Sequence, residues 1–136
     1  QMLKRTIGPY KDFDGEMRET TWYFDVSQPE LVELEVEFDA GFEGMIQKII
    51  ETTDRKGLVK IFKRIVLMGV GDQVMDNGVL RFKKSDEIRQ RFADTMAYNV
   101  LFMELATDDE KAAEFMQGVL PELPADASSD PDKPSA

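Results

Sequence analysis

The 136-residue chain contains no cysteine and no histidine. Without cysteine it has no disulfide framework, no thiolate metal site and no thiol nucleophile, which fits a reducing compartment such as the cytosol. Without histidine it also lacks the commonest general base and the commonest metal ligand. Enzymes can work without these residues, but their absence counts against a catalytic role, and we expect no metal or cofactor.

Long apolar runs and an excess of positive charge are absent as well. No run of residues is apolar enough to span a bilayer, and no basic start precedes a signal-like apolar stretch. The 17 basic and 27 acidic side chains give a net charge of −10, which opposes binding to nucleic acid or to an anionic membrane. We expect a soluble protein that binds neither.

The charges that are present are unevenly distributed along the chain. Residues 12–39 contain ten carboxylates and one cation, whereas residues 55–91 contain ten cations and four carboxylates. Two explanations are open: the two segments face each other within the fold, or they set the register between protomers or with a partner. We favour the first and keep the second open.

The N-terminal residues are predicted to form a β-hairpin. Residues 2–7 and 16–26 are read as its two strands, and the second is rich in the β-branched and aromatic side chains that favour strands. The string Asp12-Phe13-Asp14-Gly15 between them is typical of a turn. It lacks the third ligand position and the final glutamate of an EF-hand loop, so we do not expect a calcium site.

Periodic apolar side chains after this hairpin predict about five helices. The first begins at Ser27-Gln28-Pro29-Glu30, where Ser27 and Glu30 form a capping box and the proline fits the first turn. The second covers residues 45–54. The third covers residues 55–68, in which basic side chains lie opposite an apolar face.

The second half of the chain contains one more hairpin and the most apolar helix. A tight turn at Asp76-Asn77-Gly78 predicts a small hairpin near residues 73–82. Residues 85–106 are predicted to be one long helix through the core, because its start can be capped by serine and its second half has no polar face. A second capping box at Thr107 begins the last helix, which Pro121 ends.

The predicted fold is therefore α+β and mainly α-helical, with an N-terminal β-hairpin followed by about five helices. Residues 1–121 form one domain, a size that can bury a core without disulfides or metals. Residues 122–136 form an acidic tail rich in proline and serine that cannot bury apolar surface, so we expect it to be disordered.

Several short strings carry a family resemblance. Three of them are Tyr23-Phe24-Asp25-Val26-Ser27 with Glu30-Leu31, Ile61-Phe62-Lys63 with Leu67 and Gly71, and Asp76-Asn77-Gly78 with Phe82-Lys83-Lys84-Ser85. The fourth comprises Phe92, Thr95, Ala97-Tyr98, Leu101-Phe102-Met103-Glu104-Leu105-Ala106-Thr107-Asp108, Ala112-Ala113, Phe115 and Leu120-Pro121. In order and spacing, these strings resemble the tail assembly chaperones of long-tailed phages with flexible tails and of related prophages. The resemblance covers residues 2–121, with one departure at Gly69-Val70-Gly71-Asp72, where family members often carry an aromatic residue before the second glycine.

The resemblance implies a function that composition does not. Such chaperones act in the host cytoplasm, bind the long helical tape measure protein, keep it soluble, help to recruit tail tube subunits and are absent from the mature virion. Many members also exist as a longer frameshifted form whose extra domain contacts the tail tube protein. The resemblance thus implies a binding protein that is not an enzyme, with a homo-oligomer around the tape measure protein as one arrangement.

Eight methionines and nine phenylalanines suit an adaptable surface for apolar helices, because methionine repacks easily. On this basis the candidate partner-binding residues are Leu31, Leu34, Phe38, Met45, Phe102, Met103, Phe115 and Met116. Apolar side chains on a helical stripe belong more often to a core than to an interface, so we expect several of them to be buried. The candidate self-association residues, from the acidic and basic segments, are Glu33, Glu37, Lys60, Lys63 and Arg64.

An alternative function comes from a different class. The ten acids of residues 12–39 would also suit a small acidic phage regulator that mimics nucleic acid and blocks the basic cleft of a host protein. Such binding would be strongly sensitive to salt, whereas binding through an apolar groove would persist at high salt.

Overall fold

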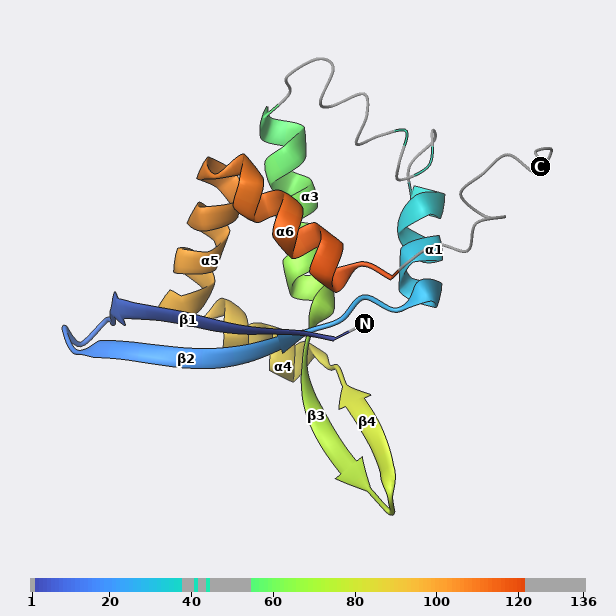
Figure 1. Cartoon of the computed structure of the whole chain (residues 1–136), viewed down its shortest axis with the longest axis horizontal. Helices are drawn as coiled ribbons and strands as arrows, with labels where there is room; N and C mark the ends of the chain where they lie inside the picture. The colour runs from blue at the N-terminus through green and yellow to red at the C-terminus, as the bar shows by residue number, and fades with distance from the viewer. Residues whose placement is uncertain (1, 38–40, 42–43, 45–54, 122–136) are drawn as a thin grey trace.

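A computed structural model of the protein describes residues 2–37, 41, 44 and 55–121. These residues form an α+β fold with a four-stranded antiparallel sheet, in the strand order β1-β2-β3-β4, and five helices (Figure 1). In chain order the elements are β1 Leu3–Lys11, β2 Met17–Phe24, α1 Gln28–Glu37, α3 Arg55–Gly69, β3 Val70–Asp76, β4 Val79–Lys83, α4 Asp86–Ala93, α5 Met96–Thr107 and α6 Asp109–Val119.

Strands β1 and β2 form the predicted N-terminal hairpin. They pair antiparallel from Leu3 opposite Phe24 to Lys11 opposite Met17, so β1 is longer than the pattern indicated. At the turn, Arg18 donates hydrogen bonds to both Asp12 and Asp14, at 2.8 and 2.7 Å. The acidic string therefore forms the turn, as predicted, and its carboxylates accept hydrogen bonds from Arg18.

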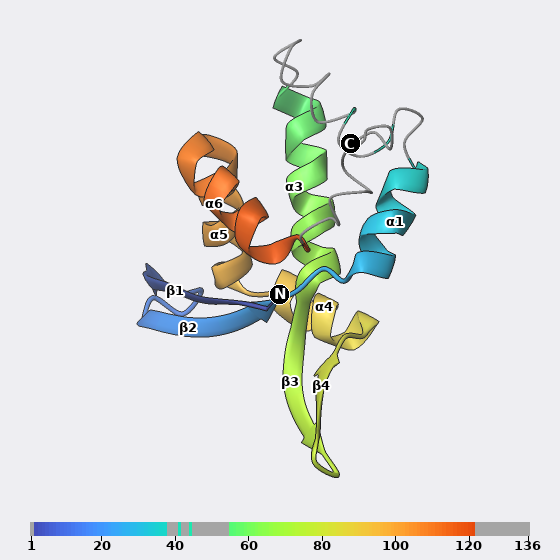
Figure 2. The same cartoon turned by 45° about the vertical axis from the view of Figure 1, so that its right-hand side comes forward.

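Strands β3 and β4 form the second predicted hairpin, around a two-residue turn at Asn77 and Gly78. Both turn residues have positive φ, 52° and 80°, which suits asparagine and glycine. Strand β3 pairs with β2 only where Tyr23 faces Gly71 and Phe24 faces Val70. Beyond that joint the hairpin extends away from the other elements in both views (Figures 1 and 2).

The core lies where α3, α5 and α6 pack beside the N-terminal hairpin (Figure 1). Phe24 is fully buried, and its ring lies 5.6 Å from that of Phe92 and 5.3 Å from that of Phe115 in edge-to-face geometry. The Trp22 ring lies 4.6 Å from that of Phe92. One aromatic cluster thus joins β2 to α4 and α6.

The predicted single helix over residues 85–106 is wrong, because the chain divides there into α4 and α5. Ser85 caps α4 as expected, by accepting a hydrogen bond from the Ile88 N–H. The next helix has its own cap, since Thr95 is extended and its hydroxyl accepts from the Tyr98 N–H. The apolar period continues across the break, which is why the pattern suggested one helix.

The predicted capping box at Thr107 is also wrong by one residue. Thr107 is the last residue of α5, and its hydroxyl donates to the Met103 carbonyl at 2.7 Å. Asp108 caps α6 instead, because its carboxylate accepts from the Glu110 and Lys111 N–H groups. Its charge also suits the positive end of the helix dipole.

The capping box at the start of α1 is confirmed. The Glu30 N–H donates to the Ser27 hydroxyl at 3.3 Å, and the Ser27 N–H donates to the Glu30 carboxylate at 2.9 Å. The predicted helix over residues 45–54 and the predicted tail over residues 122–136 lie outside the described residues. The five described helices therefore differ from the five predicted, because α4 and α5 take the place of one long helix and the helix over residues 45–54 is not among those described.

Candidate functional site: partner-binding surfaces

The position of α1 is set by a junction around Lys84. Its ammonium donates to the Glu30 carboxylate and to the backbone carbonyls of Asp25 and Met68, at 2.5, 2.5 and 3.0 Å. Only 16% of the Lys84 side chain and 26% of the Glu30 side chain are exposed. This single cation therefore ties the start of α1 to the end of α3 and to the segment after β4.

The environment of Glu30 changes its acidity. Partial burial acts to raise the pKa of Glu30, but the hydrogen bonds from Lys84 and from the Ser27 N–H outweigh burial and lower the pKa below its usual 4.5. In the exposed β1–β2 turn, the Arg18 hydrogen bonds likewise lower the pKa of Asp14. Both carboxylates are held in the charged form by contacts within the chain.

The acidic and basic segments meet inside one molecule. Besides Lys84 and Glu30, Arg64 on α3 donates to the Glu37 carboxylate on α1 at 2.6 Å. These two contacts match the first explanation of the uneven charge distribution. Among the self-association candidates, Glu33, Lys60 and Lys63 are exposed to solvent, and their role in assembly stays a prediction.

The structure places the predicted partner-binding residues in three groups. Leu31, Leu34 and Phe115 are buried in the core, with 4, 0 and 1% of their surface exposed, so the expectation that several are buried is confirmed. Met103 on α5 is 56% exposed, and Phe102 and Met116 are half-buried. Phe38 and Met45 lie outside the described residues. That any of these residues contacts a partner stays a prediction.

Sequence reasoning missed other exposed apolar side chains. They occur at the N-terminus, at the β1–β2 turn and the start of β2, on α1 and on the β3–β4 hairpin, and comprise Met2, Phe13, Met17, Val32, Val36, Met75, Val79 and Leu80. The hairpin residues could have been noticed from the Asn-Gly turn flanked by apolar residues. Their exposure could not, because it depends on whether another element covers the hairpin.

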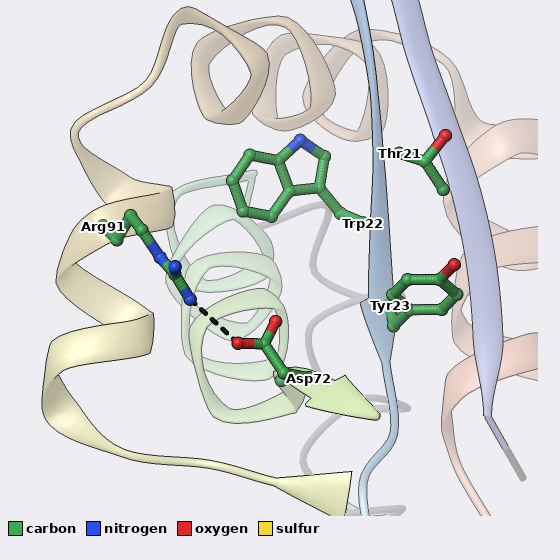
Figure 3. A pocket seen from close by; sticks show the side chains of 6 residues that line it. Thr21, Trp22, Tyr23, Asp72 and Arg91 are labelled. Atoms are coloured by element: carbon green, nitrogen blue, oxygen red, sulfur yellow. Dashed lines mark hydrogen bonds and ion pairs between the residues drawn. The ribbon is translucent and has the colours of Figure 1, made fainter. Parts of the chain in front are cut away.

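A small open hollow of about 170 Å³ lies where β2 and β3 diverge. Figure 3 shows Arg91 reaching from α4 to Asp72 at 2.9 Å, with Trp22 on the neighbouring strand. Thr21, Tyr23 and Gly71 complete the lining. Asp72, the carboxylate of this lining, is bound by an arginine, so the arrangement favours a structural joint rather than a catalytic centre.

A membrane-spanning helix and a metal site would each be recognisable among the described residues. No helix among them is long and apolar enough to cross a membrane. No group of three or more acidic side chains there is arranged to hold a metal ion. The exposed apolar surfaces are therefore the features of this part of the chain that most resemble a functional site.

The chain was also compared with known proteins. A family model described as phage tail assembly chaperone matches residues 2–131. No match was found among curated proteins or among solved structures.

Proposed function

The chain belongs to the phage tail assembly chaperone family, and we propose that it binds the tape measure protein, keeps it soluble and helps to recruit tail tube subunits. It does so in the host cytoplasm and is absent from the mature virion. A longer frameshifted form supplies the contact with the tail tube protein. The family match across nearly the whole chain is the observation that carries this proposal.

The contact surface that we propose lies on α5 and α6, which pack against each other. Met103 presents a large flexible apolar side chain to solvent, and Phe102 and Met116 are partly accessible. Methionine and phenylalanine side chains can adapt to the varied apolar faces of a long helical partner. The buried candidates Leu31, Leu34 and Phe115 belong to the core, so they do not touch the partner in this proposal.

The experiment that tests this function is co-expression with the tape measure protein from the same genome. Size-exclusion chromatography with light scattering then gives the mass of the soluble product. We expect the tape measure protein to be soluble and to co-elute with several copies of the chain. A tape measure protein that remains insoluble, with the chain running alone, would contradict the proposal.

The proposed surface has a matched pair of variants. Met103→Lys places a charge at the centre of the contact, whereas Asn99→Lys places the same charge one helical turn away at a position that is exposed and already polar. We expect Met103→Lys to reduce the co-eluting tape measure protein by roughly tenfold, as loss of a central contact does. Asn99→Lys should leave it unchanged. Equal effects of the two variants would place the contact elsewhere.

A further inference from the structure

The β3–β4 hairpin has the features of an interface. It is separate from the surface on α5 and α6 that we propose for the tape measure protein. It extends away from the other described elements, and β4 is the last strand of the sheet that the described residues form (Figures 1 and 2). Met75 and Leu80, which pair across the hairpin, are exposed by 67 and 59%, and Val79 on the opposite face is exposed by 60%. A two-stranded hairpin is marginal on its own in water, and a cluster of exposed apolar side chains marks a surface that a partner covers.

The register of the hairpin shows which side chains lie on each of its two faces. Met75 pairs with Leu80, and Gln73 pairs with Phe82, so one face is apolar toward the tip. The other face carries Arg81, which donates to Asp76 at 3.1 Å. Because the pair that closes a two-residue turn is the hydrogen-bonded one, Leu80 and Phe82 direct their backbone N–H and C=O groups away from β3.

We propose that β4 pairs antiparallel with β4 of a second copy of this chain. In the proposed register, Arg81 lies opposite its own counterpart on the two-fold axis, and Leu80 of each copy lies opposite Phe82 of the other. The outward backbone groups of Leu80 and Phe82 then hydrogen-bond across the axis. The product is a continuous antiparallel sheet whose four central strands are β3 and β4 of the two copies, and the two apolar faces join into one surface.

The residue pattern of β4 supports both a second copy as the partner and this register of pairing. All five residues pair, and apolar side chains meet apolar ones twice. A shift by one residue instead places Leu80 opposite Arg81 or Lys83. The two central arginines repel each other weakly, because each already binds Asp76 of its own chain. The same kind of self-pairing along β3 is disfavoured, since it places Asp72 opposite Asp76.

A disulfide test reads out the register directly, because the chain has no cysteine of its own. In Arg81→Cys the two new thiols lie on the axis, at the Cα separation that a disulfide needs. In Val79→Cys, on the same face, the two thiols are about 14 Å apart along the strands. We expect oxidation to crosslink the first variant roughly tenfold faster than the second, because only the first meets disulfide geometry.

Light scattering on the purified full chain supplies an independent measurement. The unmodified chain should form a dimer whose fraction rises with concentration. Leu80→Pro should give a monomer, because it removes an outward N–H that the hairpin itself does not use. Circular dichroism checks that Leu80→Pro folds. The crosslinking test with Arg81→Cys and Val79→Cys does not depend on the folding of Leu80→Pro.

Three results would each overturn the proposal: a monomer at every concentration, equal crosslinking of the two cysteine variants, or a dimer that persists in folded Leu80→Pro. A dimer that instead dissociates on charge reversal at Lys60 and Lys63 would place the interface on the basic face of α3. All these tests use the chain alone, so their failure is distinct from a failure to bind the tape measure protein.

Discussion

At the scale of single residues, Lys84 connects three segments of the fold. Its ammonium is mostly buried and contacts acceptors that belong to three separate segments, at Asp25, Glu30 and Met68. A buried cation with complete hydrogen bonds is tolerated, whereas the groups left behind when it is removed are not. Lys84 should therefore contribute to stability through the acceptors that it satisfies.

Replacing Lys84 with methionine tests this contribution. The variant keeps a similar apolar stem but removes the cation from Glu30, which keeps the Ser27 N–H, and one donor from each of the Asp25 and Met68 carbonyls. We expect the free energy of unfolding to fall by about 1–3 kcal/mol, as is typical for unsatisfied buried groups. Urea unfolding followed by circular dichroism measures it. Lys11→Met is the control, because Lys11 is exposed and lies on β1, and it should change stability by less than about 0.5 kcal/mol.

The lowered pKa of Glu30 predicts a pH dependence. A carboxyl group whose pKa is lower in the folded state contributes stability above its unfolded pKa, here 4.5, and loses that contribution as the pH falls through the folded pKa. The free-energy difference between the unmodified chain and Glu30→Gln should thus be constant from neutral pH to about pH 5 and shrink below it. Thermal unfolding across this range measures the difference. A gap that does not change with pH would show that the charge of Glu30 contributes nothing.

At the scale of elements, the helix caps decide where the chain turns. Thr95 and Asp94 lie between α4 and α5, where the Thr95 hydroxyl also donates to the Phe92 carbonyl at 2.7 Å. The Asp94 carboxylate accepts from the Gln90 amide at 2.8 Å. These short-range bonds satisfy the ends of both helices, so the break costs little although the apolar pattern is continuous.

The two threonines of this region form a matched pair. Thr95→Ala removes a helix cap and should lower the free energy of unfolding by about 1 kcal/mol. Thr107→Ala removes a hydroxyl that bonds back to its own helix and should change it by less than about 0.5 kcal/mol. Chemical denaturation distinguishes the two. A larger loss of unfolding free energy in Thr107→Ala than in Thr95→Ala would contradict this assignment of the caps.

The elements show which features can be predicted from sequence. The turn at Asn77 and Gly78 and the caps at Ser27 and Ser85 were predictable, because each depends on residues within one helical or hairpin turn. The two-residue joint between β2 and β3 was not, since it depends on residues far apart in the chain. The exposure of Met103 and of the hairpin tip also follows from packing, which periodicity does not report.

At the scale of the whole molecule, the charge distribution bears on the choice between the two functions. A nucleic-acid mimic needs carboxylates that are free to meet a basic cleft. Within the acidic segment, Asp12 and Asp14 bind Arg18, Glu30 binds Lys84, and Glu37 binds Arg64. These pairs reduce the charge available to a partner, and large apolar side chains are exposed on α5 and on both hairpins. The balance favours an apolar contact.

Salt separates the two kinds of contact. At about 1 M salt the Debye length is roughly 3 Å, so attraction between exposed charges is largely screened, whereas burial of apolar surface is not weakened. We therefore expect the complex with the tape measure protein to remain intact on size-exclusion chromatography at high salt. Dissociation on raising the salt, together with capture of a basic host protein at low salt, would instead favour the mimic. Met103→Lys adds a second criterion, because it should weaken an apolar contact at every salt concentration, while an acidic mimic would tolerate it.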